Sequence, residues 1–149
     1  MGLMLDVNGI KIKMNLEKCD DAQTGIVYFK HDISISSGDW LKFQVDNGAE
    51  RIFPSSIEEI AKALTEQADN KLTDVKEVIC IELAMIFKLY PQTQAKDYYG
   101  NDNGDIQDIR TELQVYFWND RLTANHLTVV LGRDEITKLR DYLVSALNG

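Results

Sequence analysis

The stretch that decides the fold is LMLDVNGIKIKMNL, residues 3–16. At its centre lies Asn8-Gly9, the strongest two-residue signal for a hairpin, because both positions of a type I′ turn need positive φ. Beyond the turn, apolar and polar residues alternate, so one strand face is predicted to enter a core and the other to meet water. The apolar positions are Ile10, Ile12, Met14 and Leu16. The stretch therefore predicts an antiparallel hairpin.

Further strands follow the same logic. Residues 25–36 and 39–46 are rich in β-branched and aromatic residues and flank Ser37-Gly38, which predicts a second hairpin. Asn47-Gly48 is another turn signal and could lead into a short strand at 51–53. Residues 109–118 and 121–131 flank a turn at Asn119-Asp120. Because the strands come in hairpin-linked groups, the sheet is expected to be antiparallel.

Residues 75–90 are apolar on both faces of an extended chain, which favours one long central strand that Pro91 ends. Glu82 interrupts the second face. A carboxylate there must be paired or have its pKa raised. The sequence leaves two interpretations open: an ion pair with Lys88 or Arg110, or an acid or base that lines a pocket.

Two helices are predicted. The first follows Pro54, with Ser55 and Ser56 each three residues before a glutamate as in a capping box, and it ends near Asp69-Asn70. The last begins after Gly132 with Asp134 as its cap. Both carry one apolar stripe. The fold class is thus α+β: a single domain over residues 1–149, in the order ββββαβββα, with about seven strands in a mostly antiparallel sheet covered by two amphipathic helices.

The charge of the chain narrows the classes of partner. Aspartate and glutamate number 24 against 16 lysines and arginines, a formal net charge of −8. Nucleic-acid binding and docking on anionic membranes both depend on basic residues, so neither is expected. An acidic surface favours solubility and attraction to a basic partner.

The compartment is expected to be the cytoplasm. Cys19 and Cys80 are 61 residues apart and form no CxxC motif, so they are typical of free thiols in a reducing environment. The first residues alternate and contain charge, unlike a signal peptide. No apolar run reaches the roughly 18 residues of a membrane helix.

The segment DYYGNDNGDIQD, residues 97–108, holds four aspartates and no lysine or arginine. An EF-hand loop with Gly104 at its sixth position would have Tyr99 first and Arg110 last, where a bidentate glutamate is needed. We therefore predict no metal site. The segment is expected to be a long turn between strands. Two interpretations of it stay open: a contact surface for a basic partner, or an ordinary solvated loop.

Catalytic patterns are missing from the sequence. There is no GxSxG, GxGxxG or GxxxxGK[ST] motif. His31 and Asp32 are neighbours in a strand, so their side chains point to opposite faces and do not form a triad. His126 shares a strand face with apolar residues and is interpreted as a half-buried structural histidine. We expect no catalytic residues and no cofactor.

Aromatic residues next to acids are typical of protein-binding hot spots. Tyr116 and Trp118 lie on the strand face opposite the predicted core set, so either a covering element packs on them or they are displayed. The predicted partner-binding residues are Asp97, Tyr98, Tyr99, Asp102, Asp105, Asp108, Tyr116 and Trp118.

The chain resembles small acidic immunity proteins of bacterial polymorphic and contact-dependent toxin systems. The resemblance rests on its strand-rich body, its acidity, and HLTVVLGRDEITKLRDYLVSAL at 126–147, a final strand that runs into an amphipathic helix. It implies neutralisation of one cognate toxin by a stoichiometric complex and assigns no individual residue.

The leading hypothesis is therefore a non-enzymatic module that binds and inhibits a basic protein partner. One alternative is a small-molecule-binding protein or small enzyme with a pocket around Glu82 and His126. Another is a structural homo-oligomer, such as a homodimer, that uses an aromatic sheet face.

Overall fold

The computed structural model describes residues 2–45, 51–118 and 122–149. The elements in chain order are β1 (Gly2–Val7), β2 (Ile10–Asp20), β3 (Val27–Ser37), β4 (Leu41–Gln44), α1 (Pro54–Ala68), β5 (Lys76–Cys80), the 3-10 turn η1 (Ile81–Leu83), β6 (Met85–Tyr90), β7 (Thr93–Lys96), β8 (Asp102–Gln107), β9 (Arg110–Trp118), β10 (Leu122–Leu131) and α2 (Arg133–Asn148). The chain is α+β, as the sequence predicts.

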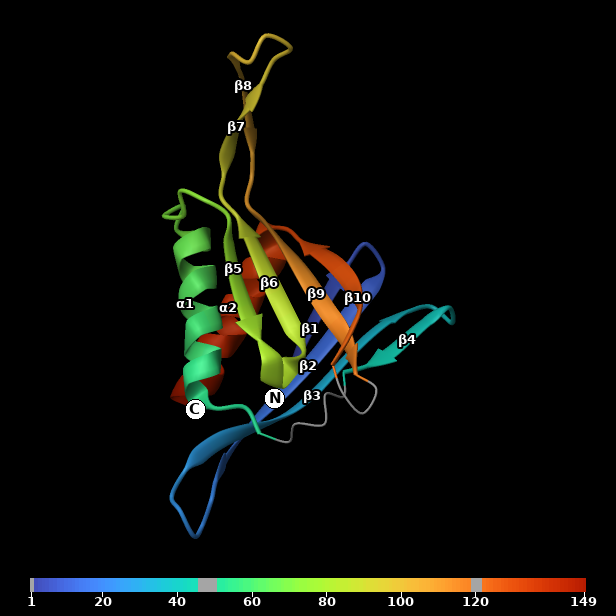
Figure 1. Ribbon diagram of the computed structural model, residues 1–149, viewed down its shortest axis with the longest axis vertical. Coiled ribbons are helices and arrows are strands. Elements are labelled where there is room, and N and C mark those ends of the chain that lie inside the picture. Colours follow the sequence, from blue (N-terminus) through green and yellow to red (C-terminus); the bar gives the residue numbers. More distant parts are fainter. Residues whose placement is uncertain (1, 46–50, 119–121) are drawn as a thin grey trace.

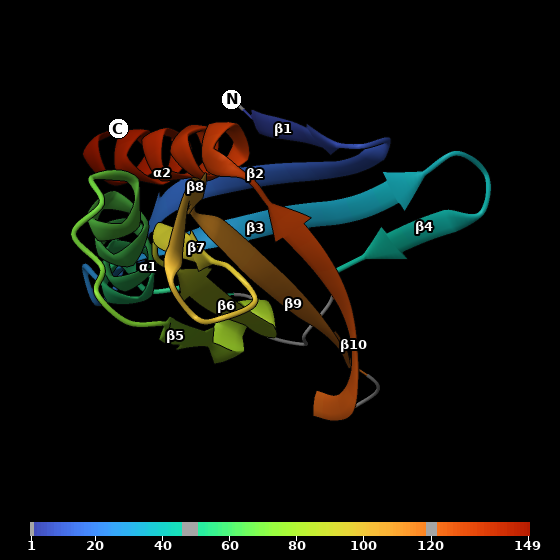
Figure 2. The same ribbon diagram turned by 90° about the horizontal axis from the view of Figure 1, so that it is seen from above.

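The strands form three antiparallel sheets instead of the single sheet of about seven strands that was predicted. Sheet A has the order β1-β2-β3-β4, sheet B has the order β10-β9-β6-β5, and β7 pairs with β8 alone. Figures 1 and 2 show α1 and α2 side by side at one end, with sheets A and B running away from them. Helix α2 contacts both β1 and β10, the edge strands that face each other across the gap between the sheets.

The first hairpin is confirmed. Asn8 and Gly9 have φ of +53° and +90°, and Leu5 pairs with Ile12 across the turn. The alternating apolar side chains enter the core as predicted, with Ile12, Met14 and Leu16 buried. The predicted turn at Asn47-Gly48 and the turn at Asn119-Asp120 lie outside the described residues. Of the short strand expected at 51–53, the structure has a single bridge between Ile52 and Phe29.

The prediction of one long strand over 75–90 is wrong. The segment folds back at η1, and β5 then pairs antiparallel with β6, with Ile79 opposite Ile86. Ala84 ends the turn in the left-handed region at φ +53°, where an L side chain costs roughly 1–2 kcal/mol. The fold-back changes the faces: Val78 and Leu83 are buried. A continuous strand would have placed those two on opposite faces.

Helix α1 begins two or three residues earlier than a cap at Ser55 or Ser56 would place it. Phe53 occupies the N-cap position without a side-chain hydrogen bond, and Pro54 follows at the first helical position, where its missing N–H is not needed. The predicted capping box is therefore not formed, and the Ser56 hydroxyl instead donates to the carboxylate of Glu82. In α2 the N-cap is Gly132. Asp134, predicted as the cap, lies in the first turn, where its charge suits the helix dipole.

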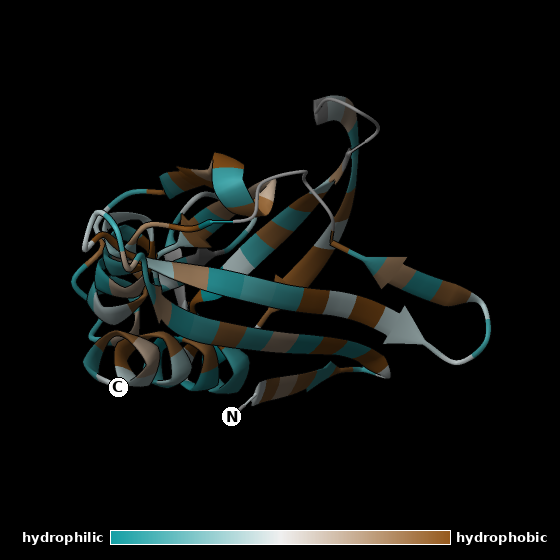
Figure 3. Cartoon of the chain, turned by 90° about the horizontal axis from the view of Figure 1, so that it is seen from below, coloured by the Kyte–Doolittle hydropathy of each residue, from teal (hydrophilic) through white to brown (hydrophobic). Residues whose placement is uncertain are grey.

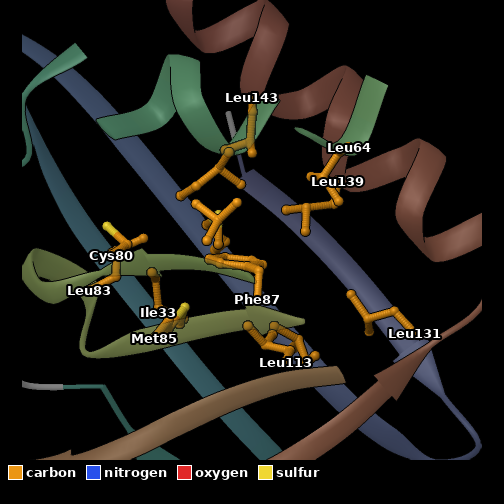
Figure 4. Packing of buried hydrophobic residues seen from close by; sticks show 14 of the residues in the cluster. Ile33, Leu64, Cys80, Leu83, Met85, Phe87, Leu113, Leu131, Leu139 and Leu143 are labelled. Atoms are coloured by element: carbon orange, nitrogen blue, oxygen red, sulfur yellow. The ribbon is translucent and has the colours of Figure 1, made fainter. Parts of the chain in front are cut away.

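One hydrophobic core joins both sheets and both helices. Figure 4 shows Ile33 of sheet A approaching Phe87 and Leu113 of sheet B, with Leu64 and Leu139 brought in by the helices. Each of these side chains is almost completely removed from solvent. Burial of an aliphatic or aromatic side chain of this size contributes about 1.5–3 kcal/mol. The helices are thus held on the sheets by the stripes predicted from the sequence.

A buried polar side chain fixes α1 on sheet B. Gln67 is fully buried; its amide nitrogen donates to the carbonyls of Tyr90 at 3.1 Å and Arg110 at 2.8 Å. Its carbonyl oxygen accepts from the hydroxyl of Thr111 at 2.9 Å, and Thr111 is also fully buried. If the Gln67 side chain were removed, the groups that it binds would lose these hydrogen bonds in a place that water does not reach.

We expect Gln67→Met to lower the free energy of unfolding by about 2–3 kcal/mol, because it keeps the volume but leaves buried polar groups unpaired. Lys62→Met, on the exposed face of the same helix, is the control and should stay within about 0.5 kcal/mol of the parent. Chemical denaturation measures both. A loss in Gln67→Met no larger than in the control would show that the cluster does not hold the helix.

Candidate functional site

The β7–β8 hairpin projects from the body of the protein. Its strands pair with each other, from Thr93 opposite Gln107 to Lys96 opposite Asp102, and with neither large sheet. Figure 1 shows the hairpin extending well beyond the sheets, at the end where β6 stops and β9 starts. The acidic segment 97–108, the candidate contact surface, was predicted to be a long turn; it instead forms a tight turn at 97–101 followed by strand β8.

The tip of this hairpin is a defined turn that displays two aromatic rings. The carboxylate of Asp97 accepts hydrogen bonds from the backbone N–H groups of Tyr99 and Asn101, both at 2.9 Å, and Gly100 adopts φ +81°. Tyr98 and Tyr99 are 95% and 84% exposed, with their rings edge to face at 5.4 Å. Asp97 therefore shapes the turn, and the tyrosines are the groups that it presents.

An ion pair secures the base of the hairpin. Arg133, the first residue of α2, donates to both carboxylate oxygens of Asp108, from Nε at 3.1 and 2.9 Å and from Nη2 at 2.6 Å. The same guanidinium donates to the carbonyl of Ala68 and to the side chain of Asn70, at the end of α1. One arginine thus connects the hairpin, the end of α1 and the start of α2.

The electrostatics of this pair follow from its geometry. The hydrogen bonds from Arg133 hold the pKa of the Asp108 carboxyl below its usual value, and the carboxylate in turn raises the pKa of the guanidinium. The side chain of Asp108 is half exposed. Since solvent screens such a pair, its contribution is expected to be about 1 kcal/mol, at the upper end for exposed ion pairs with good bidentate geometry.

The Gln67 cluster supports the same base. Tyr90 is the last residue of β6, Arg110 is the first residue of β9, and the two are paired across the sheet. Their carbonyls are the ones that Gln67 binds. Next to Tyr90, Pro91 is buried. Both chain connections to the hairpin are therefore held by helix α1.

The predicted contact residues do not form one site. Asp97, Tyr98 and Tyr99 are at the tip, Asp105 is exposed on β8, and Asp108 is engaged at the base. Tyr116 lies six residues into β9, about 20 Å along the strand from the hairpin. The side chains of Asp102 and Trp118 lie outside what the structure describes.

Tyr116 and His126 form a separate pair on the outer face of sheet B. Their rings are 4.8 Å apart, and the Tyr116 hydroxyl donates to Gln114 at 3.2 Å. His126 is exposed, so the prediction of a half-buried structural histidine is wrong. It pairs in register with Tyr116 and packs on its ring, which leaves its other side in water.

The structure does not bring Glu82 and His126 into one pocket. Glu82 lies in η1, where its carboxylate accepts from Ser56 at 3.2 Å and from the Cys80 thiol at 3.5 Å. Strands β9 and β6 separate β10, which carries His126, from β5. The predicted ion pair of Glu82 with Lys88 or Arg110 is not formed either, since both cations lie over the ring of Tyr90. Burial raises the pKa of the Cys80 thiol to about 12, so that thiol is unreactive at neutral pH.

Within residues 2–45, 51–118 and 122–149, no cluster of three or more histidine, cysteine or acidic side chains could hold a metal ion. Neither described helix is long and apolar enough to cross a membrane. No family model matches the chain, and no curated protein sequence matches it.

Sequence reasoning missed the two residues that support the hairpin. Gln67 stands next to the apolar stripe of α1, and only its position after Ala63 and Leu64 indicates that it faces the core. Arg133 lies at the N-terminal end of a helix, where a cation is disfavoured by the helix dipole. A cation in that position is a local signal that it serves some other partner, here Asp108.

We expect Asp108→Asn to lower the free energy of unfolding by about 1 kcal/mol at neutral pH, because it removes the charge that Arg133 binds. The pKa of Asp108 is depressed in the folded protein, so its contribution is complete above the ordinary carboxyl pKa of about 4 and is lost as the pH falls through the lower folded value. Denaturation of both proteins along a pH series should show the difference shrink below that pH. Asp39→Asn, in the exposed β3–β4 turn, is the control; a difference that persists unchanged in acid would contradict the ion-pair account.

Proposed function

We propose that this chain is a non-enzymatic protein-binding module of the immunity or inhibitor type, which neutralises a basic partner such as a bacterial toxin by forming a complex with it in the cytoplasm. The observation that carries the proposal is the pair of tyrosines at the tip of a projecting, anchored hairpin. Two large rings held fully in solvent contribute little to the stability of the fold itself.

The chemistry of the tip suits a protein partner. Tyrosine presents a large, rigid surface that is apolar on its ring faces and polar at its hydroxyl, and it is enriched at hot spots that fill pockets on a partner. The Asp97 turn fixes the backbone of the tip before binding. Because less freedom is lost on association, a preorganised tip binds more tightly than a mobile one.

The charge distribution supports a basic partner. The chain carries −8 overall, and the hairpin segment 97–108 contributes −4 to that sum. Asp97 and Asp108 make intramolecular hydrogen bonds, yet Asp97 has no cation among those partners and adds to the field around the tip. Such a field accelerates the encounter with a cationic protein and is weakened by salt.

The cysteines are consistent with a reducing compartment. Cys19 is partly buried and Cys80 is buried, and both are free thiols. Chains of this size build a core without disulfides, and free thiols persist in the cytosol.

The proposal is tested by replacing both tip tyrosines with serine. The partner is isolated from cells of the source organism on the immobilised full-length chain, identified by mass spectrometry, and titrated in purified form. We expect a single basic protein, whose affinity falls at least about thirtyfold in the double variant, because hot-spot residues contribute 2 kcal/mol or more. The melting temperature should not change.

Trp40→Ser is the matched control. Trp40 is 74% exposed, at the β3–β4 turn far from the hairpin, so its loss removes a similar exposed ring without touching the tip. Its affinity for the isolated partner should equal that of the parent. Binding that survives the loss of both tyrosines, or a partner that is acidic, would overturn the proposal; so would a partner whose activity is unaffected in the complex.

A further inference from the structure

A second exposed apolar feature lies at the opposite end of sheet B from the hairpin. Ile79 on β5 and Ile81 in η1 are 59% and 66% exposed. Ile79 lies just before the fold-back between β5 and β6, and Ile81 is its first residue; Ala84 ends the fold-back in the left-handed region. Figure 3 shows hydrophobic and hydrophilic residues alternating along the long strands. Exposed large aliphatic side chains gathered in one place commonly mark an interaction surface.

These isoleucines border a small apolar pocket. Its volume is about 170 Å³, and it lies between the β5–β6 turn and Tyr116 of β9. The backbone N–H of Tyr116 donates to the carbonyl of Ala84 at 2.8 Å, which fixes the tyrosine beside the turn. Ile86, which pairs with Ile79, forms part of the wall. The pocket is therefore built by paired backbone and does not depend on a loose loop.

The pocket lies over the hydrophobic core, with the sheet between them. Cys80 and Met85 belong to the lining of the pocket, but they are paired across β5 and β6 and their side chains are almost completely buried on the core side of the sheet. Figure 4 shows both near Leu83 in the core. An apolar group that entered the pocket would displace water from Ile79, Ile86 and Tyr116 on the outer face.

The size of the pocket selects the kind of occupant. Sites for drug-sized ligands usually measure about 300–1,000 Å³, well above this volume. A single aliphatic side chain fits, and the exposed isoleucines on the rim would contact the main chain on either side of it. The occupant is therefore an anchor residue of a polypeptide.

Charged residues around the pocket define what should flank that anchor. Glu77 is exposed beside Ile79, and Glu112 is half exposed on the same face of β9 as Tyr116. The carboxylate of Glu82 is directed away from the pocket, to Ser56 and the Cys80 thiol. Lys88 lies between Glu77 and Glu112 in the sheet register, and its amino group contacts Tyr90 at the far end of the face. Two glutamates against one lysine leave this face acidic, which favours lysine or arginine next to the anchor.

We propose that the pocket formed by Ile79, Ile81, Ile86 and Tyr116 is a second docking site, independent of the hairpin, for a polypeptide segment with one aliphatic anchor side chain flanked by basic residues. Apolar burial supplies the affinity at the centre, and the glutamates supply the selectivity at the rim. The β5–β6 turn and the projecting hairpin lie at opposite ends of sheet B, so a substitution at one site leaves the residues of the other site in place.

The test uses the full-length protein with isoleucine methyl groups labelled for NMR. The probe is the capped peptide Lys-Arg-Leu-Arg-Lys, compared with Lys-Arg-Ala-Arg-Lys and Glu-Asp-Leu-Asp-Glu. We expect saturable shifts of Ile79, Ile81 and Ile86 with the first peptide, and affinities at least about fivefold lower with the other two. Ile81→Ser should weaken binding of the first peptide by a similar factor.

Ile106→Ser is the matched control, because Ile106 is 63% exposed but lies on the hairpin. It should bind the peptide as the parent does. The variant that lacks both tip tyrosines should also bind the peptide normally. Peptide binding at this pocket is therefore tested separately from the proposed inhibitory function. Shifts centred on Ile106, equal binding of the acidic peptide, or an absence of shifts would overturn the proposal. Peptide-free shifts at Ile79 and Ile81 that grow with protein concentration would also overturn it, because they would identify a second copy of the chain as the occupant.

Discussion

The buried carboxamide of Gln67 is the constraint on which the presentation of the hairpin depends. It binds the carbonyls of Tyr90 and Arg110, and these are the paired residues at which the chain leaves sheet B and returns to it. Thr111 completes the cluster. A buried polar group left without a hydrogen-bond partner costs about 1–3 kcal/mol. Separation of helix α1 from the two strand ends would therefore be unfavourable. The position of the hairpin is thereby set by the core.

A two-stranded ribbon is marginally stable in water when it stands alone. The β7–β8 hairpin has no partner sheet, and its strands gain little from burial. Its order must come from its ends, and each end has its own device: Asp97 organises the tip, while Arg133 and Asp108 tie the base to both helices. Such an arrangement allows a long reach without a large core behind it. It also leaves the aromatic rings at the tip free to contact another molecule.

Much of the fold could be predicted from the sequence, because hairpin turns and amphipathic stripes are local signals. Asn8-Gly9 is one example, and the stripes of α1 and α2 are others. The segment 75–90 could not, since a continuous apolar run satisfies both a central strand and two shorter strands. The two are distinguished by a 3-10 turn that ends at Ala84 in the left-handed conformation. Glycine or asparagine usually occupies such a position, so an alanine gives no sequence signal for the turn. The fold-back makes β5 and β6 separate, neighbouring strands of sheet B.

The candidate site was predicted as a set of acidic and aromatic residues, and the structure divides the acidic ones by what each carboxylate contacts. In the sequence, Asp97, Asp105 and Asp108 are indistinguishable. In the structure, Asp97 shapes a turn, whereas Asp108 binds Arg133, which is 25 residues away in the sequence. Only tertiary contacts can separate them, because Arg133 belongs to another element. The tyrosines are different: Tyr98 and Tyr99 sit between Asp97 and Gly100, and an Asp-x-x-Gly turn places its two central side chains outside the hydrogen-bonded loop whatever the rest of the fold does. Exposure of the rings is therefore a local property of the sequence, while their fixed position on the molecule is a property of the core.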